Sequence, residues 1–478
     1  MKPISSASNI QPVLVVKFGG TSVGSPEGFS KVLDILQDAW ASRTGLVAVT
    51  SALSGVTDAL LRQAELASRG ETGGLESSAR ELLERHTQMA QEFVPDDGLR
   101  GATLHTIEAL LADFTGLCRA IAILGEASPR ARDAVASLGE RMAAPLVAAA
   151  CQARGLPAQA LDAMGLIISD DHFQDATPLW EETRSAVRAR LRPLIEAHQL
   201  PVVTGFCAST PQGVVTTLGR GGSDYSAAIL AAALPAEEVC IWTDVDGVMS
   251  ADPRLVPEAH TIPELSFREV AELAYYGAKV LQPKSIRPVV DAGIRLSVRN
   301  TFRPEGTGTR IVSGNHAVDD GVVKAVTAFA GHRLITVEGR GMLGVPGVAA
   351  RTFASVAATG TSVPLISQAS SEQSICFAVP ADAAERVLAS LHRGFQAELA
   401  RGDVDRIWAG EEIAILTVVG EGMRSTPGVA GRVFGALGNE GVNVVAIAQG
   451  ASEVSISMIV DAADMGRAVR ALHALIRH

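Results

Sequence analysis

The last third of the chain repeats itself, and this repeat limits the folds open to that region. Pro346-Gly347-Val348-Ala349 returns as Pro427-Gly428-Val429-Ala430, and Gln368-Ala369-Ser370-Ser371-Glu372 returns as Gln449-Gly450-Ala451-Ser452-Glu453. Both pairs lie 81 positions apart, so the two copies align without a gap. Two copies are too few for a solenoid, which needs at least three. The repeat therefore predicts paired α+β units, each running strand, glycine turn, helix, strand, hairpin, strand, helix.

The first copy also contains a pattern that resembles a dinucleotide-binding loop. Gly339, Gly341 and Gly344 have the spacing of that loop between a predicted strand and a predicted helix. The second copy has Ser425 where the third glycine should fall, and no acidic residue closes a second strand about twenty residues later. We therefore expect this turn to serve a regulatory ligand or the packing of the helix.

The preceding part of the chain alternates between strand and helix patterns. Residues 12–17 and 45–50 have the apolar runs of buried strands, and residues 26–40 and 56–69 have helical periodicity. This alternation favours a largely parallel sheet covered by helices. Residues 75–155 are almost purely helical and predict an insertion beside the sheet, after which strand patterns return. The expected domains are residues 1–312, 321–405 and 406–478.

Composition excludes several classes of function. The chain has 478 residues, 47% of them hydrophobic, so it can form several packed domains. A net charge of −11 and only 4% aromatic residues argue against a basic or aromatic surface for binding nucleic acid. The five cysteines are scattered, which argues against a disulfide or metal framework. The N-terminus is polar and no stretch approaches the length of a membrane span, so we expect a cytoplasmic protein with no membrane partner.

A glycine-rich stretch, residues 216–224, joins apolar sequence to a helix of small residues at 225–234. Its glycines allow backbone N–H groups to approach an anion, and Ser223 or Asp224 can cap the helix that follows. Arg220 offers a planar, two-pronged grip for a carboxylate or phosphate. A plain strand-to-helix turn is the alternative for this stretch taken alone.

A second phosphate-binding candidate follows the first strand. Lys17-Phe18-Gly19-Gly20-Thr21-Ser22 combines glycine backbone, hydroxyl groups and a lysine that can neutralise phosphate charge. The Walker pattern G-x-x-x-x-G-K-[ST] is absent from the chain. An ordinary turn is again the alternative, but a lysine at the end of a buried strand requires an anionic partner.

Two further stretches carry charge. Thr243-Asp244-Val245-Asp246-Gly247 and Asp252-Pro253-Arg254 follow a strand, where α/β proteins bind ligands, and they lack the spacing of a calcium loop. Lys279 follows a helix, and Glu140 lies within an apolar helical pattern. For Lys279 and Glu140 a solvated surface position is the alternative to a functional role.

Together these stretches supply lysines, an arginine and glycine nests. No histidine is placed as a base, and no nucleophilic cysteine or G-x-S-x-G elbow is present. Phosphoryl transfer depends mainly on positioning and charge neutralisation, so this inventory suits it. The sequence therefore predicts a kinase that uses a nucleotide and Mg²⁺.

The motifs in this order resemble the aspartokinases of the amino acid kinase family. They are Lys17–Val23, Leu218–Tyr225, Trp242–Gly247 with Asp252–Arg254, and Gly277–Leu281, followed by the paired repeats. The resemblance covers nearly the whole chain. It implies a three-layer α/β/α kinase domain, two βαββαβ ACT domains, and phosphorylation of the β-carboxylate of L-aspartate by ATP, the entry to lysine, threonine, methionine and isoleucine synthesis.

The resemblance also implies roles for individual residues. Those implied to hold the phosphoryl group are Lys17, Gly19, Gly20 and Thr21. Asp224 would orient Lys17 rather than act as a base, since a carboxylate nucleophile has no proton to lose at neutral pH. The implied aspartate pocket consists of Ser51, Thr57, Glu140, Phe206, Arg220, Gly221 and Ser223, with Arg220 on the α-carboxylate and Glu140 on the ammonium group. The implied ATP site adds Thr243, Asp244, Met249, Arg254 and Lys279, and no residue is assigned as a metal ligand.

Met249 departs from the family, which commonly has tyrosine there; a methionine can still cover an adenine face.

Within the family, the chain most resembles the kinase half of bifunctional aspartokinase/homoserine dehydrogenases. That subgroup binds threonine through glutamines that resemble Gln368 and Gln449, so threonine is the expected inhibitor and lysine the second candidate. The sequence ends at His478, shortly after the second repeat, so no dehydrogenase half is expected. ACT units usually pair across chains, which implies a homodimer or homotetramer.

Two alternatives stay open at this point. A related kinase acting on glutamate or a carbamate would keep Lys17 and the glycine loops but would not need Arg220 and Glu140. A non-catalytic amino acid sensor would combine the ACT units with an inactive kinase domain, and the presence of all the charged motif positions argues against it.

Overall fold

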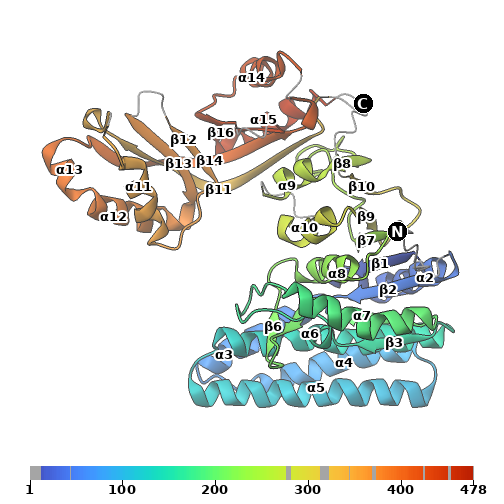
Figure 1. The fold of residues 1–478 in the computed structure, drawn as a ribbon. Coiled ribbons are helices and arrows are strands. Elements are labelled where there is room, and N and C mark those ends of the chain that lie inside the picture. The colour runs from blue at the N-terminus through green and yellow to red at the C-terminus, as the bar shows by residue number, and fades with distance from the viewer. Residues whose placement is uncertain are drawn as a thin grey trace, which may run out of the picture. The chain divides into compact units, whose positions relative to one another are not determined.

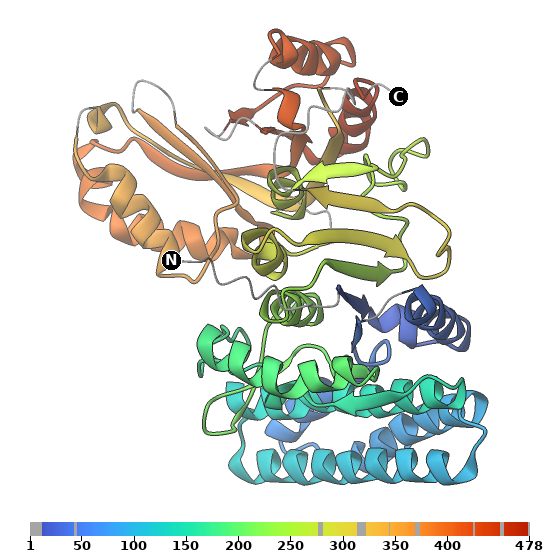
Figure 2. The same cartoon turned by 45° about the vertical axis from the view of Figure 1, so that its right-hand side comes forward.

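The computed structural model describes residues 12–42, 45–275, 281–312, 322–343, 345–368, 373–423, 426–449 and 454–476. They divide into two compact units (Figures 1 and 2). Unit 1 holds the described residues up to Val248, Pro263–Phe267 and residues 281–312. Unit 2 holds Met249–Ile262, residues 268–275 and the described residues from 322 onward. Two stretches that the sequence analysis assigned to the first domain, 249–262 and 268–275, therefore group with the repeats.

Unit 1 is built on an eight-stranded sheet in the order β3-β4-β2-β1-β7-β9-β10-β8. The strands from β3 to β9 run parallel, and β10 is antiparallel to β9. All six residues of β1 and of β2 are buried, as expected for central strands covered on both faces. The strands are β1 (Val13–Phe18), β2 (Gly45–Thr50), β3 (Ala158–Leu161), β4 (Leu200–Thr204), β7 (Glu238–Thr243), β8 (Glu264–Ser266), β9 (Arg295–Asn300) and β10 (Thr309–Val312). Because β1, β2, β4 and β7 are parallel, their carboxyl ends meet at one edge, where α/β proteins bind ligands.

Helices surround this sheet, and the predicted insertion at 75–155 forms three of them. The helices of unit 1 are α1 (Gly20–Val23), α2 (Pro26–Ser42), α3 (Val56–Ser68), α4 (Leu75–Phe93), α5 (Asp97–Leu124), α6 (Pro129–Ala153), α7 (Trp180–Glu196), α8 (Gly222–Ala233) and α10 (Pro283–Asp291), with the 3₁₀ turn η1 (Ala163–Gly165). In Figure 1, α5 forms the outermost layer of this unit. A hairpin of β5 (Cys207–Ser209) and β6 (Val215–Thr217) leads into the glycine loop.

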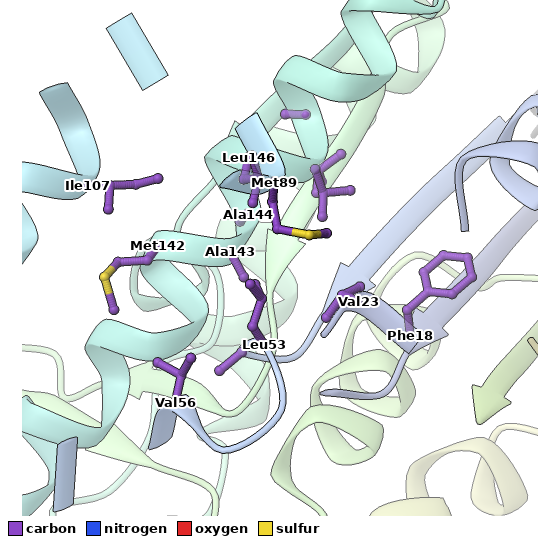
Figure 3. Packing of buried hydrophobic residues seen from close by; sticks show 14 of the residues in the cluster. Phe18, Val23, Leu53, Val56, Met89, Ile107, Met142, Ala143, Ala144 and Leu146 are labelled. Carbon is purple, nitrogen blue, oxygen red and sulfur yellow. The ribbon is translucent and has the colours of Figure 1, made fainter. Parts of the chain in front are cut away.

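Helix α6 is the central helix of unit 1. Its length and apolarity would suffice to cross a membrane, contrary to the sequence-based expectation, but 83% of its apolar window is buried inside the protein. Figure 3 shows Leu53, from the connection between β2 and α3, and Val56, the first residue of α3, beside Met142 and Ala143 of α6. This packing seats the middle of α6 against the carboxyl end of β2.

Unit 2 contains one antiparallel six-stranded sheet in the order β12-β13-β11-β14-β16-β15. Its strands are β11 (Ala325–Glu338), β12 (Leu365–Gln368), β13 (Ser374–Pro380), β14 (Arg406–Val419), β15 (Ala446–Ala448) and β16 (Ser455–Asp461). Its helices are α9 (Phe267–Tyr275, from Arg268 on), α11 (Val348–Ala357), α12 (Ala384–Gly394), α13 (Gln396–Arg401), α14 (Val429–Asn439) and α15 (Met465–His473), with the 3₁₀ turns η2 (Arg340–Met342), η3 (Ala381–Ala383), η4 (Glu421–Met423) and η5 (Ala462–Asp464). The predicted α/β domain followed by two α+β repeats is confirmed, and an antiparallel sheet excludes the dinucleotide-binding fold at Gly339.

The two repeats share the long strands β11 and β14, which run side by side in Figure 2. Ala325 at the start of β11 pairs with Val419 at the end of β14, and Glu338 pairs with Arg406 at the other end. Each repeat therefore takes its fourth strand from the long strand of the other repeat. This exchange explains why both repeats form one sheet.

The stretch 249–262 belongs to the core of the second repeat. Ala251 and Val256 are buried in the same apolar cluster as Val469 and Leu472 of α15. Ser250 is fully buried, and its Oγ lies 2.9 Å from Nε2 of His473. These contacts attach Met249–Ile262 to the last helix of the second repeat.

Candidate active site

Lys17 and Asp224 form a buried ion pair at the carboxyl end of β1. Nζ of Lys17 lies 2.6 Å from Oδ1 of Asp224, and the two side chains are 11% and 12% exposed. The expectation that Ser223 or Asp224 caps the helix was wrong. Helix α8 begins at Gly222, its N-cap is Gly221 in the left-handed conformation, and no side chain caps it. Asp224 lies instead in the first turn of α8, where it holds the lysine.

The backbone of Gly19 and Gly20, where the sequence predicts a phosphate nest, follows this lysine directly. The Gly19 N–H donates to the Trp242 carbonyl oxygen at 3.1 Å, which ties the end of β1 to β7. A Cβ atom at Gly19 would lie 3.7 Å from Nζ of Lys17 and 3.9 Å from Oγ1 of Thr21. At Gly20, a Cβ atom would lie 3.0 Å from the Ala52 carbonyl oxygen. Glycine at position 19 therefore leaves the backbone bare between an ammonium and a hydroxyl group, an arrangement that suits phosphate oxygens, and glycine at position 20 allows close approach to the backbone of Ala52.

Glu140 lies inside the protein, which excludes the solvated surface position that the sequence analysis gave as the alternative to a functional role. It is 5% exposed on α6, and its Oε2 has no hydrogen-bond partner among the described residues. Burial raises the pKa of Glu140 to about 8, and a hydrogen bond from the Ala52 backbone and the charge of Lys17 oppose the rise. A buried carboxyl group with an open oxygen favours a cationic ligand, because a positive charge would stabilise its ionised form.

Two predicted pocket residues lie near Glu140. Oγ1 of Thr57, in the first turn of α3, would lie 3.2 Å from a Cβ atom at Gly139. Ser51 follows β2, and its N–H donates to the Phe18 carbonyl oxygen at 3.1 Å. Thr57 therefore lies against the residue that precedes Glu140 on α6, and Ser51 joins the end of β2 to the end of β1.

The remaining predicted pocket residues belong to the glycine loop and its support. Phe206 has a left-handed backbone (φ 64°), and its Cδ2 would lie 2.6 Å from a Cβ atom at Gly222. Ser223 packs on Gly205, where a Cβ atom would lie 2.7 Å from its Oγ. Arg220 is exposed and has no ion-pair partner in the part of the chain that the structure describes. The loop thus presents an unpaired guanidinium group.

The predicted ATP residues fall into three groups. Thr243 ends β7 in unit 1 and Asp244 follows it, and Oγ1 of Thr243 donates to Oδ1 of Asp244 at 3.2 Å. Met249 and Arg254 belong to unit 2, where Nη2 of Arg254 lies 2.6 Å from Oδ2 of Asp252. Lys279 lies outside the described residues. The roles of these residues in ATP binding stay predictions.

Comparison with known proteins identifies the family. The model of the amino acid kinase family matches residues 12–300, and the ACT domain model matches residues 335–395 and 416–475. An aspartokinase of Schizosaccharomyces pombe is 31% identical over 96% of this chain and 92% of its own length. The chain belongs to the aspartokinases of the amino acid kinase family.

Two further comparisons agree with this family assignment. A chloroplastic bifunctional aspartokinase/homoserine dehydrogenase 1 of Zea mays is 38% identical over 96% of this chain, and the chain spans about half (50%) of that relative's length. Escherichia coli aspartokinase III, solved in complex with aspartate and ADP in the R-state, has a TM-score of 0.78 and 30% identity over 97% of this chain and 99% of its own. The same enzyme was also solved with lysine and aspartate in the T-state, with a TM-score of 0.77.

The predicted effector glutamines occupy equivalent places in unit 2. Gln368 ends β12, and Gln449 follows β15 by one residue; both are exposed. These strands are the two edges of the sheet, yet Oγ of Ser367 donates to the Ile447 carbonyl oxygen at 3.1 Å. The two edge strands therefore lie beside each other.

Sequence reasoning missed two residues that support the glycine loop. Oγ of Ser285 in α10 donates to the Gly221 carbonyl oxygen at 3.0 Å. Asp133 of α6 binds the backbone of Thr217. A signal for Asp133 was present, because Asp133, Ser137 and Glu140 have the spacing of one helix face within an otherwise apolar helix.

Proposed function

We propose that the chain transfers the γ-phosphoryl group of ATP to the β-carboxylate of L-aspartate and releases ADP and 4-phospho-L-aspartate. The observation that carries this proposal is Glu140, a buried carboxyl group with an open oxygen close enough to Lys17 to feel its charge. A phosphoryl-transfer site needs positive charge, so an acidic group inside it indicates a substrate with its own cation. The E. coli aspartokinase III complex with aspartate and ADP supports the same assignment.

The amino acid would be held through its two α-substituents. Glu140 would accept hydrogen bonds from the ammonium group, with the hydroxyl groups of Ser51 and Thr57 nearby. Arg220 would bind the α-carboxylate through its two-pronged guanidinium group. Holding both α-groups directs the β-carboxylate toward the transferring phosphoryl group, and such positioning is a large part of catalysis.

The chemistry would rest on Lys17. Aspartate enters with its β-carboxylate ionised, so the nucleophile needs no general base at neutral pH. Lys17 would neutralise charge on the transferring phosphoryl oxygens while the Gly20 N–H donates to them, since the Gly19 N–H is already bonded to the Trp242 carbonyl oxygen. Asp224 would hold the ammonium group of Lys17 in place, as it does in this structure.

Mg²⁺ completes the proposal as the partner of ATP. Within the described residues, no group of three or more His, Cys, Asp or Glu side chains is arranged to hold a metal ion. Mg²⁺ is often held by one or two carboxylates together with substrate phosphates, and Asp244 is an exposed carboxylate at the end of β7. A chelator should therefore abolish ADP release and leave aspartate binding, measured by calorimetry, intact.

The proposed function is tested by ADP release and hydroxamate formation. Aspartate with Mg·ATP should give ADP and a hydroxylamine-trapped product, and glutamate should give neither. Lys17→Ala should abolish both signals. ADP release with glutamate in place of aspartate would indicate a related kinase, and no release with either would indicate an amino acid sensor.

We propose further that threonine inhibits the enzyme through the region of Gln368 and Gln449, with lysine as the second candidate. The support is the equivalent, exposed placement of both glutamines on neighbouring edge strands. Threonine at millimolar concentration should lower the rate, and Gln368→Ala and Gln449→Ala should relieve the inhibition. Gln396→Ala, a change of another exposed glutamine in the first repeat, should not. Inhibition by lysine alone would overturn the threonine assignment.

Self-association through the ACT repeats is also proposed. The edge strands carry exposed apolar side chains, Ile366 at 47% and Ile447 at 45% exposure. Exposed apolar groups on sheet edges are typical of surfaces that pair with another chain. Light scattering should give the mass of a dimer or tetramer, and Ile447→Asp should shift it toward the monomer.

A further inference from the structure

Asp133 is a buried carboxylate that the proposed chemistry does not use. It lies on α6, is 1% exposed, and has no cationic side chain as a partner in the described residues. Instead it accepts three hydrogen bonds: at Oδ2 from the Gln174 N–H (2.9 Å) and the Thr217 N–H (3.0 Å), and at Oδ1 from the Thr217 hydroxyl group (2.7 Å). Burial raises the pKa of this carboxyl group, and the hydrogen bonds oppose the rise. A carboxylate in such a place is expensive to bury, so its three contacts must have a structural purpose.

These contacts reach the loop that carries Arg220. Thr217 ends β6, three residues before Arg220, and its carbonyl oxygen accepts from the Ala176 N–H at 2.9 Å. Both backbone polar groups and the hydroxyl group of Thr217 are therefore bonded. The Arg220 loop begins at a point that Asp133 fixes to α6.

The same carboxylate holds the segment on which that loop rests. Gln174 has a left-handed backbone (φ 71°), which is uncommon for a residue other than glycine, and its N–H donates to Asp133. At Gly219, a Cβ atom would lie 3.0 Å from the Gln174 carbonyl oxygen and 2.6 Å from Oδ1 of Asp175. The Arg220 loop therefore packs directly on a turn that Asp133 also secures.

Glu140 lies seven residues further along α6, on the same face of the helix as Asp133. One rigid helix thus carries the proposed ammonium ligand and the anchor of the proposed carboxylate ligand. We propose that Asp133 is a positioning residue that sets the spacing between Arg220 and Glu140, and so fixes the recognition of the α-amino acid group. This inference rests on the proposed function.

The three hydrogen bonds that Asp133 accepts predict different effects for asparagine and alanine at this position. Asparagine can turn its oxygen toward the two N–H donors and its NH₂ group toward the Thr217 hydroxyl oxygen, which can accept. Alanine can satisfy none of the three donors. The charge of Asp133 is therefore dispensable, and its hydrogen-bond geometry is not.

The test compares variants of the full chain that fold, as judged by circular dichroism and thermal melting. Asp133→Ala should raise the aspartate KM by about tenfold or more, with kcat within about threefold and the ATP KM within about twofold of the wild type. Asp133→Asn should keep the aspartate KM within about threefold of the wild type. Asp96→Ala removes a carboxylate that accepts from the Leu99 N–H at the start of α5, away from the loop, and should lower stability without changing KM.

A folded Asp133→Ala variant with an unchanged aspartate KM overturns the inference, as does an equal rise in both KM values. If Asp133→Ala does not fold, Thr217→Val removes the hydroxyl group alone and should raise the aspartate KM by about threefold; no rise overturns the inference. Wild-type activity with aspartate is measured first. Its absence overturns the proposed function and this inference together, whereas an active wild type with an unaffected Asp133→Ala variant overturns this inference alone.

Discussion

Nζ of Lys17 lies 2.6 Å from Oδ1 of Asp224, which joins the end of β1 to the first turn of α8 with little access of solvent to either side chain. Removing one partner of a buried ion pair leaves the other charge without compensation. The pair therefore fixes the ammonium group beside the Gly19 backbone before any substrate binds. This is the preorganisation that electrostatic catalysis requires.

Asp224→Asn keeps the shape of the side chain and removes its charge. We expect kcat to fall by about 100-fold with little change in either KM, because the ammonium group of Lys17 loses its fixed position during transfer. Glu76→Gln is the control, since it removes an exposed ion pair with Arg119 and should leave kcat unchanged. A loss confined to the aspartate KM would contradict the role assigned to Asp224.

Arg220→Ala should raise the aspartate KM by about 10- to 100-fold, because a charge-assisted contact with the α-carboxylate is lost. Arg220→Lys should have an intermediate effect, since lysine keeps the charge but not the fork. β-Alanine keeps the ammonium and acceptor groups of aspartate and lacks the α-carboxylate, so Arg220→Ala should lose the preference for aspartate over β-alanine. A raised ATP KM with an unchanged aspartate KM would indicate that Arg220 binds a phosphate group of ATP and not the α-carboxylate of aspartate.

The fold was predictable where its signals are local in the sequence. Alternating strand and helix patterns predicted the parallel sheet, and the offset of 81 residues predicted two similar units. The shared sheet was not predictable, because the exchange of β11 and β14 depends on pairings such as Ala325 with Val419, far apart in the chain. The assignment of Met249–Ile262 to unit 2 likewise depends on contacts with α15, such as that of Ser250 with His473.

In the candidate site, too, some residues were predictable from the sequence and others were not. Lys17 and Arg220 stand in glycine-rich motifs that can be read directly from the sequence. Glu140 could not be separated from a surface acid, because its burial depends on how α6 packs on the connection between β2 and α3. The spacing of Asp133 and Glu140 on one helix face was readable from the sequence, but the role of Asp133 was not, because its partners Gln174 and Thr217 are distant in sequence and two of its three hydrogen bonds come from backbone N–H groups.

Aspartate binding should depend on pH through Glu140. Burial holds the pKa of Glu140 at about 8 in the free protein, so binding an ammonium group at lower pH requires loss of a proton. We expect the aspartate Kd to tighten between pH 6.5 and 8.5, by at most about tenfold per pH unit below the pKa. Calorimetry in buffers of different ionisation enthalpy should detect the released proton. Glu140→Gln should bind weakly with no pH dependence, and a flat wild-type profile would contradict the assignment.

The same pKa predicts a change in stability without substrate. A carboxyl group whose pKa rises on folding stabilises the fold below its unfolded value of 4.5, and this contribution is lost as the pH rises toward 8. The slope within that window is at most about 1.4 kcal/mol per pH unit. The Tm of Glu140→Gln relative to the wild type should therefore rise between pH 6 and 8. A constant Tm difference across this range would contradict the raised pKa.

Gly221 and Gly213 form a matched pair for testing the geometry of the loop. Both have left-handed backbones, with φ of 72° and 77°. At Gly213 a Cβ atom would meet nothing within 4 Å, whereas at Gly221 it would lie 2.8 Å from Cγ of Gln282 and 2.9 Å from Oγ of Ser285. Alanine should cost about 1–2 kcal/mol of backbone strain at either position. Only Gly221→Ala should also displace the Arg220 loop from α10 and raise the aspartate KM, by about tenfold.

A variant of Ser285 separates the effect of steric crowding at position 221 from the effect of backbone strain there. Ser285→Ala removes the atom 2.9 Å from the new Cβ, so the double variant Gly221→Ala/Ser285→Ala should recover part of the aspartate affinity while keeping the strain. Ser285→Ala alone loses its hydrogen bond to the Gly221 carbonyl oxygen and should weaken aspartate binding slightly. If Gly221→Ala and Gly213→Ala have the same aspartate KM, contact with α10 does not set the position of Arg220.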